Sequence, residues 1–183
     1  MISTVPDILI VLLLTTVMKV PLQNAFNNSD LAIVKSLGVL GPSLVAIFIA
    51  FGLLYWVPLA RIIRGQVLML KQQEFVTAAK ALGAPGTMII KKHLLPNCIG
   101  QIIVTTCLEI PSAIFLESFL SFLGLGVSAP MTSLGSLAAA ALGGMYTYTY
   151  RLIIPSIILS VMILSLNLFG DGLRDALDPR LKK

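Results

Sequence analysis

The sequence predicts an all-α protein of the polytopic membrane class, a bundle of helices that cross a lipid bilayer. Two observations carry this prediction. Of the 183 residues, 57% are hydrophobic and only 11% are charged, which is too little charge for the surface of a water-soluble domain. The apolar residues are also gathered into long runs, and a helix needs about 20 such residues to cross a bilayer.

The N-terminal apolar run, residues 5–18, is shorter than that length. We expect it to cross if its helix continues toward Leu22 or if upstream sequence is missing. It has no basic segment before it and no small-residue cleavage site after it, so it lacks the pattern of a signal peptide. Residues 19–36 are mixed in polarity and contain the turn-forming Asn27 to Asp30. We expect an extramembrane loop there.

Three further runs are candidate spans. Residues 39–60 form the clearest one, with Trp56 as an interfacial anchor near its end and Pro58 as the expected position of a kink. Residues 99–122 form the next, and Pro111 within them predicts a bent or broken helix. Residues 152–169 form the last, and the polar residues 170–183 are predicted to be a tail beyond it.

Residues 124–151 are predicted to lie outside the lipid between the last two spans. Small residues recur in them at every fourth position, a spacing that suits close helix packing. They are Gly135, Ala139 and Gly143, and in parallel Ser136, Ala140 and Gly144. Tyr146, Tyr148 and Tyr150 follow, and clustered tyrosines are typical of a membrane interface.

The elbow, residues 74–96, is the one long polar passage between two strongly apolar runs, and we predict two short helices in it. Four residues recur at i, i+3, i+4 and i+7 and predict one apolar face: Phe75, Ala78, Ala79 and Leu82. Gly83 is expected to end the first helix in the left-handed conformation, and Pro85 prevents its continuation. We expect Thr87 to cap the second helix and Pro96 to end it.

The basic residues indicate an orientation. Ten of the 13 lie either between Arg61 and Lys92 or in the tail. By the positive-inside rule, the elbow and the tail are expected to lie in the cytoplasm. The formal net charge of +5 is explained in the same way, and we expect no nucleic-acid partner.

Several motifs at and after the elbow resemble those of a known family. They are Thr77-Ala78-Ala79 followed by Gly83 and Leu95-Pro96, Arg61 to Gln66, His93 to Asn97, Leu120 to Gly126, and Asn167 to Pro179. In this order they resemble the permease subunits of bacterial ATP-binding-cassette importers. Within these, the chain is similar to the C-type permease of the dipeptide, oligopeptide and nickel importers.

The resemblance implies a type I (MetI-like) permease fold with six spans, of which this chain shows the last four, so we expect it to be truncated at its N-terminus. It implies one transmembrane permease domain over residues 1–183, a cytoplasmic coupling-helix loop over 71–96 and a cytoplasmic tail over 170–183. It further implies a second, B-type permease subunit, two ATP-binding subunits and an extracytoplasmic solute-binding protein as partners, besides membrane lipid.

The elbow helix is the expected contact with the ATPases. Its residues are Glu74, Phe75, Thr77, Ala78, Ala79, Leu82 and Gly83. Small residues there allow close approach to a groove, and charged residues at the rim set the register. Thr77 stands where the family usually has glutamate. An ordinary amphipathic surface helix is the alternative.

Glu109 and Glu117 lie within an apolar run, where a carboxylate must face protein or water. They are candidates for the translocation path or for structural carboxylates, and for Glu117 we favour the structural role. In the tail, Asp171, Arg174 and Asp175 are candidates for docking, and Arg174 is spaced to pair with Asp178 if the tail is helical.

The chain has no phosphate-binding loop, so ATP hydrolysis is expected in a partner and not here. We expect no metal site and no cofactor, because the lone His93 has no second ligand and Cys98 and Cys107 lack metal-type spacing. Nickel or another small solute remains an alternative substrate. An intramembrane protease using His93 and a serine (Ser112, Ser118 or Ser121) and an assembly factor without transport activity are alternatives of other classes.

Overall fold

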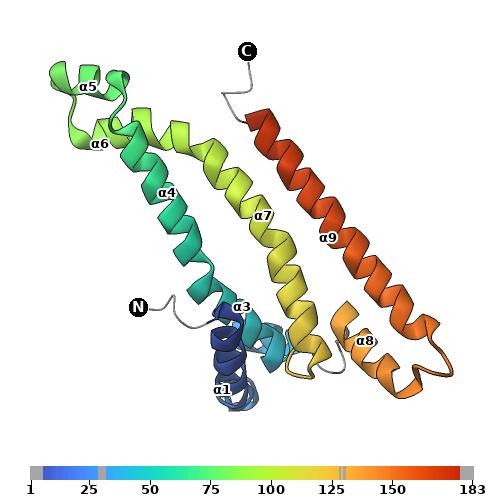
Figure 1. The fold of residues 1–183 in the computed structure, drawn as a ribbon. Coiled ribbons are helices and arrows are strands. Elements are labelled where there is room, and N and C mark those ends of the chain that lie inside the picture. Colours follow the sequence, from blue (N-terminus) through green and yellow to red (C-terminus); the bar gives the residue numbers. More distant parts are fainter. Residues whose placement is uncertain (1–5, 29–31, 128, 130, 178–183) are drawn as a thin grey trace. The chain divides into compact units, whose positions relative to one another are not determined.

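The computed structural model describes residues 6–28, 32–127, 129 and 131–177, and in these residues it contains helices and turns but no strand. The chain divides into two compact units. The first unit comprises residues 1–54 and 111–164, and the second comprises residues 55–110 and 165–183. Four helical stretches are long and apolar enough to cross a membrane. They are Ile8–Asn28, Pro42–Leu70, Gly86–Phe122 and Tyr150–Leu177, so the all-α class and the four spans are confirmed (Figure 1).

The first unit begins with three helices that pack on one another, α1 (Asp7–Asn28), α2 (Ala32–Leu40) and α3 (Pro42–Leu54). Val11 and Thr15 of α1, and Ala46, Ile47 and Ala50 of α3, are buried where these helices meet. The loop predicted over residues 19–36 is wrong for residues 19–28, which extend α1. Continuing the helix keeps their backbone groups hydrogen-bonded, which an apolar environment demands. The predicted turn at Ser29 and Asp30 lies outside the described residues.

The kink predicted near Pro58 falls at Tyr55, between α3 and α4 (Trp56–Leu70). Proline has no N–H and its ring crowds the carbonyl four residues earlier. That carbonyl belongs to Leu54, the last residue of α3. The prediction of a broken helix at Pro111 is wrong, because α7 (Leu95–Phe122) continues through this buried proline. Proline within a membrane helix is tolerated where neighbouring groups compensate for its single lost hydrogen bond.

Beyond α7 come the helix α8 (Leu134–Ala141), the short 3₁₀ helix η3 (Leu142–Gly144) and α9 (Tyr150–Leu177). Residues 170–177, the part of the predicted tail that the structure describes, are helical and continue α9. Gly170 is buried, and a Cβ there would lie 2.7 Å from a methyl carbon of Leu108. The absence of a side chain at Gly170 therefore lets α9 pack closely on α7 within the second unit.

Candidate functional site

The elbow joins α4 to α7 in the second unit. It consists of α5 (Glu74–Ala81), the single turn α6 (Gly86–Met88) and the π-helical segment η2 (Ile89–Leu94) (Figure 1). Buried Val76, Ala79, Ile89 and Leu94 form its core, and Val67, Leu70 and Ala84 pack against them. The core therefore ties α5 and η2 to the end of α4. This packing makes the elbow a small folded body.

Gly83 ends α5 as predicted. It has φ +78°, the left-handed conformation that glycine adopts without strain. Its N–H donates to the Lys80 carbonyl (3.0 Å), and the Ala84 N–H donates to the Ala79 carbonyl (3.1 Å). These two bonds are those of a Schellman motif, which satisfies the last free carbonyls of a helix. The turn after α5 is thus fixed by backbone bonds.

The second helix differs from its prediction at both ends. Pro85, not Thr87, occupies the N-cap position before Gly86. Pro96 does not end the helix, which runs on into α7. Instead η2 widens to π-helical geometry, and the Leu95 N–H donates to the Ile90 carbonyl five residues earlier. A π-bulge absorbs the mismatch that the proline ring creates.

The single apolar face predicted for α5 is wrong, because the helix is apolar on two sides. Val76 and Ala79 form the side that packs in the elbow core. Phe75, Ala78 and Leu82 are exposed instead, with Phe75 at 40% and Leu82 at 88% of full exposure. Nothing within the described residues covers most of Leu82. We call Phe75, Ala78 and Leu82 the outer face of α5.

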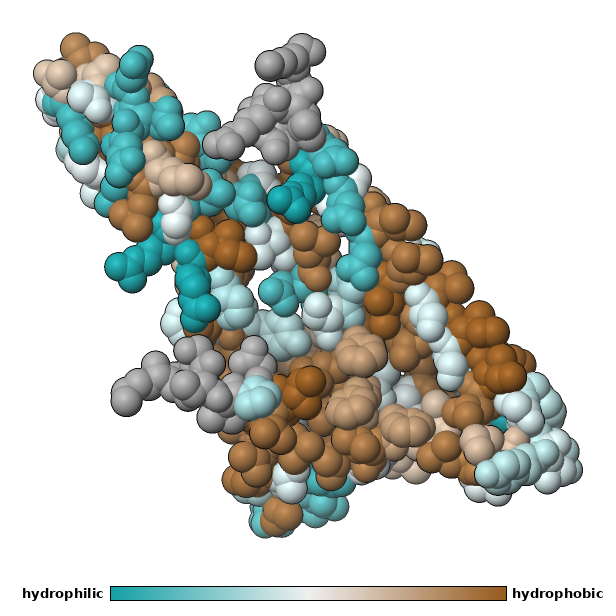
Figure 2. Space-filling model, in the orientation of Figure 1, coloured by the Kyte–Doolittle hydropathy of each residue, from teal (hydrophilic) through white to brown (hydrophobic). Residues whose placement is uncertain are grey.

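Polar and charged residues border this outer face. Glu74, Thr77 and Lys80 are exposed on α5, and the Thr77 hydroxyl donates to the Gln73 carbonyl at 3.5 Å. The Phe75 ring lies 6.3 Å from the half-buried His93 ring, at an interplanar angle of 42°. His93 therefore braces the outer face from η2. Figure 2 shows hydrophilic and hydrophobic residues mixed over the elbow, whereas the surface along α9 is predominantly hydrophobic.

Glu117 organises the turn that follows α7 in the first unit. Its carboxylate accepts hydrogen bonds from Ser121 (2.6 Å) and Ser118 (3.3 Å), and the Ser121 hydroxyl in turn accepts the Val127 N–H at 2.9 Å. Gly124 has φ +78° and closes α7 with a second Schellman motif. The Leu120 to Gly126 motif was recognised in the sequence, but the hydrogen bonds that Ser121 makes to Glu117 and Val127 were not predicted. A serine one helical turn after a glutamate was the available signal.

This turn places α8 in contact with α7. A Cβ on Gly135 would overlap the carbonyl oxygen of Ser118, so the two backbones are in direct contact. The close packing expected of the small residues is confirmed at this position. It is wrong for Gly143, where a Cβ would meet nothing within 4 Å. Ser133 and Ser136 form a capping box that starts α8.

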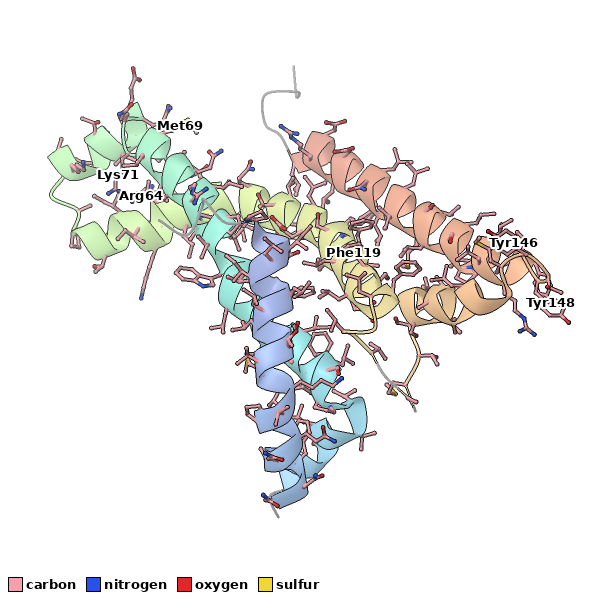
Figure 3. The ribbon with its side chains drawn as sticks, turned by 60° about the horizontal axis from the view of Figure 1, so that its bottom comes forward. Arg64, Met69, Lys71, Phe119, Tyr146 and Tyr148 are labelled. Atoms are coloured by element: carbon pink, nitrogen blue, oxygen red, sulfur yellow. The ribbon has the colours of Figure 1, made fainter. Side chains whose placement is uncertain are left out.

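A cavity of about 300 Å³ lies among α7, α8 and the start of α9. Its walls are mainly aromatic and aliphatic, with Phe119 and Leu134 among them, and Ser118 and Ser156 are its polar members. Figure 3 labels Phe119 on α7 and the exposed Tyr146 and Tyr148 beyond α8. The Arg151 guanidinium lies 4.9 Å from the centre of the Tyr148 ring.

The remaining predicted residues lie on α7 and α9. Glu109 is half-buried in α7, and Asp171, Arg174 and Asp175 are exposed on the last turns of α9. Asp178, the expected partner of Arg174, lies outside the described residues. Within the part of the chain that the structure describes, no three histidine, cysteine or carboxylate side chains come together as a metal site would require. Cys98 and Cys107 are free thiols.

The geometry does not assemble a protease site. Ser112 follows His93 by 19 residues along a helical stretch that is continuous from Gly86 to Phe122. His93 belongs to the second unit, whereas Ser112, Ser118 and Ser121 belong to the first, so neither unit by itself contains the predicted serine and histidine pair. What the second unit offers instead is a rigid apolar projection between two membrane-spanning helices.

Comparison with known proteins agrees with this architecture. Residues 1–183 match the family described as "Binding-protein-dependent transport system inner membrane component". The chain is 46% identical over 155 residues to the oligopeptide transport system permease protein OppC of Bacillus subtilis (strain 168), which covers 85% of this chain and 51% of the relative. It is 46% identical over 154 residues to the dipeptide transport system permease protein DppC of the same organism, covering 84% of this chain and 48% of that protein.

A third relative is the oligopeptide transport system permease protein OppC of Haemophilus influenzae. It is 48% identical over 140 residues, which are 76% of this chain and 45% of that protein. The chain thus spans about half the length of the curated relatives it matches.

Proposed function

Because this chain belongs to the family of inner-membrane components of binding-protein-dependent transport systems, we propose that it is a permease subunit of an ATP-binding-cassette importer for dipeptides or oligopeptides. The substrate class is supported by the relatives, which are oligopeptide and dipeptide transport system permease proteins. In the intact transporter, a B-type permease would supply the other half of the translocation path. An extracytoplasmic binding protein would deliver the peptide.

The outer face of α5 carries the coupling role. Phe75, Ala78 and Leu82 form an uncovered apolar surface on a short helix whose end is fixed by the Schellman motif at Gly83. Exposed apolar residues on a rigid projection are what a protein partner buries. Two ATPase subunits are the partners that the family implies, each holding one such helix. Closure of the ATPases around ATP would then move the elbow and the spans attached to it.

The elbow and the C-terminal end of α9 lie in the cytoplasm under this proposal. Basic residues are concentrated at both, and the positive-inside rule places such segments on the cytoplasmic side. The turn at Glu117 and the tyrosine cluster then face the external side. Glu117 serves as a structural carboxylate there, because its hydrogen bonds hold the turn that brings α8 onto α7.

Leu82→Ala tests the coupling role, because Leu82 is 88% exposed and contributes little to the fold of its own chain. Burying a leucine on a partner is worth about 1.5–3 kcal/mol. In the intact transporter, the variant should therefore lose roughly tenfold or more in ATPase affinity, measured by co-purification, and should lose labelled-peptide uptake in parallel. Leu142→Ala is the control, since Leu142 is also exposed (47%) but lies in η3, outside the elbow. Full ATPase binding and uptake by Leu82→Ala would refute docking at this face.

A further inference from the structure

The positive charge of the chain is concentrated at one place. Between residues 61 and 93 there are six basic residues and a single acidic one, Glu74. The net charge of this segment is therefore +5, which equals the formal net charge of the whole chain. Arg61 and Arg64 lie on α4, Lys71 caps its C-terminal end, Lys91 and Lys92 lie on η2, and the sixth is Lys80 on α5. We call the first five the basic collar: Arg61, Arg64, Lys71, Lys91 and Lys92.

The basic collar lies where two spans leave the apolar region. Arg61 and Arg64 are on the second half of the span Pro42–Leu70, and Lys91 and Lys92 are near the start of the span Gly86–Phe122. All five side chains are exposed. Arg64 and Lys71 are seven residues apart, so they share one face at the end of α4, and Figure 3 labels both in this region.

The two halves of the basic collar are held together by the elbow core. Val67 and Leu70 of α4 pack against the cluster that contains Ile89 and Leu94 of η2. Arg64 precedes Val67 by one turn, and Lys91 and Lys92 lie between Ile89 and Leu94. The cations of both helices are therefore fixed on one packed platform.

Exposed apolar side chains alternate with these cations. Ile62, Leu68 and Met69 are exposed on α4 at 39%, 52% and 50%, and Ile90 of η2 and Leu95 of α7 are exposed at 54% and 50%. A surface that is cationic and apolar at once suits the boundary between lipid headgroups and acyl chains. A loop surrounded by water gains nothing from exposing apolar side chains beside its cations.

We propose that the basic collar binds the headgroups of anionic phospholipids in the cytoplasmic leaflet. Basic residues immediately beside a membrane-spanning helix attract anionic lipid, each cation contributing independently of sequence. The contact is separate from ATPase docking. The outer face of α5 contains only Phe75, Ala78 and Leu82, none of them charged, whereas the collar residues are at the ends of the spans. Because the elbow core holds the cations of α4 and η2 together, the attraction for anionic lipid is confined to this site.

Trp56 provides an internal reporter, because it is the only tryptophan in the chain and is 61% exposed on α4. It precedes Arg61 by five residues, which is about 7.5 Å along a helix. A lipid whose headgroup contacts Arg61 and Arg64 extends its acyl chains toward Trp56. Bromine atoms on those chains quench tryptophan fluorescence at short range. Comparing brominated phosphatidylglycerol with brominated phosphatidylcholine therefore measures lipid preference at the collar.

The chain is reconstituted in phosphatidylcholine vesicles containing either brominated lipid at the same mole fraction. We expect stronger quenching by brominated phosphatidylglycerol, and a preference that falls by about fivefold for each cation removed. Arg61→Gln together with Arg64→Gln should abolish most of it. Lys19→Gln together with Arg151→Gln removes the same charge from other segments and should leave it unchanged.

Raising the salt concentration gives a test that needs no variant. The preference of the unaltered chain should weaken as salt screens the collar, so the test remains available if a variant does not insert. Equal quenching by the two brominated lipids in the unaltered chain would overturn the proposal. An equal loss of the preference for brominated phosphatidylglycerol in both double variants would also overturn the proposal. If Arg61→Gln with Arg64→Gln lost ATPase co-purification but kept the lipid preference, the cations would belong to the ATPase contact instead.

Discussion

The contact between Gly135 and Ser118 gives the sharpest prediction about the first unit. In Gly135→Ala, the new methyl group would overlap the Ser118 carbonyl oxygen and lie 2.6 Å from its carbonyl carbon. The obstacle is backbone near the C-terminal end of α7, and a backbone carbonyl has no rotamer by which to move aside. The helix α8 must therefore retreat from α7.

The cost follows from that retreat. Restoring ordinary contact requires a shift of more than about 1 Å, and a gap of about 1 Å already forfeits up to about half of the dispersion energy of each contact along the interface. Overpacking of this kind destabilises by about 1–3 kcal/mol. For a chain of this length the melting temperature should fall by about 2–12 °C.

The assay is thermal unfolding of the purified chain in detergent, with the cavity beside α8 as a second readout. Gly143→Ala is the matched control, because Gly143 belongs to the same fourfold repeat and a Cβ there meets nothing within 4 Å. It should be neutral or slightly stabilising through the unfolded state. Equal melting temperatures for Gly135→Ala and Gly143→Ala would refute the backbone contact.

Three further changes test other contacts by the same unfolding assay. Gly83→Ala forces an L-residue to φ +78° and should lower the free energy of unfolding by about 1 kcal/mol. Gly86→Ala is its control and should leave that free energy unchanged, because Gly86 has open space around it and an ordinary φ. Equal effects of the two variants would contradict the Schellman turn. Ser121→Ala removes both the donor to the neighbouring carboxylate and the acceptor of a backbone N–H, and should cost about 1–3 kcal/mol; Ser160→Ala, on an exposed face of α9, is its control. Val76→Asp places an unpaired charge in the elbow core, where Val76 is 0% exposed. This variant should unfold the elbow and therefore also abolish ATPase co-purification. A stably folded elbow in this variant would argue against that core.

Features that depend on local chemistry could be predicted from the sequence. The spans follow from the length of the apolar runs, because a bilayer needs about 20 apolar residues whatever packs beside them. The end of α5 follows from Gly83 and Pro85, since a left-handed cap and a missing N–H act within a few residues. Helix ends were less predictable. Residues 19–28 and 170–177 look polar, yet they continue helices.

The packing of α5 shows why tertiary structure was needed for the candidate site. Both sides of this helix are apolar at a helical period, so its sequence alone does not select which side is buried. Val67 and Leu70 from α4 and Ile89 and Leu94 from η2 make that selection by covering Val76 and Ala79.

The class of protein, its spans and the position of the elbow could therefore be predicted without coordinates, because they depend on composition and on short-range backbone preferences. Three features required the folded chain: which residues of α5 remain available to a partner, how Ser121 joins Glu117 to the following turn, and that Gly135 touches the backbone of Ser118. Each of these depends on atoms that meet across the fold, and burial on one side of a helix is what leaves the other side exposed.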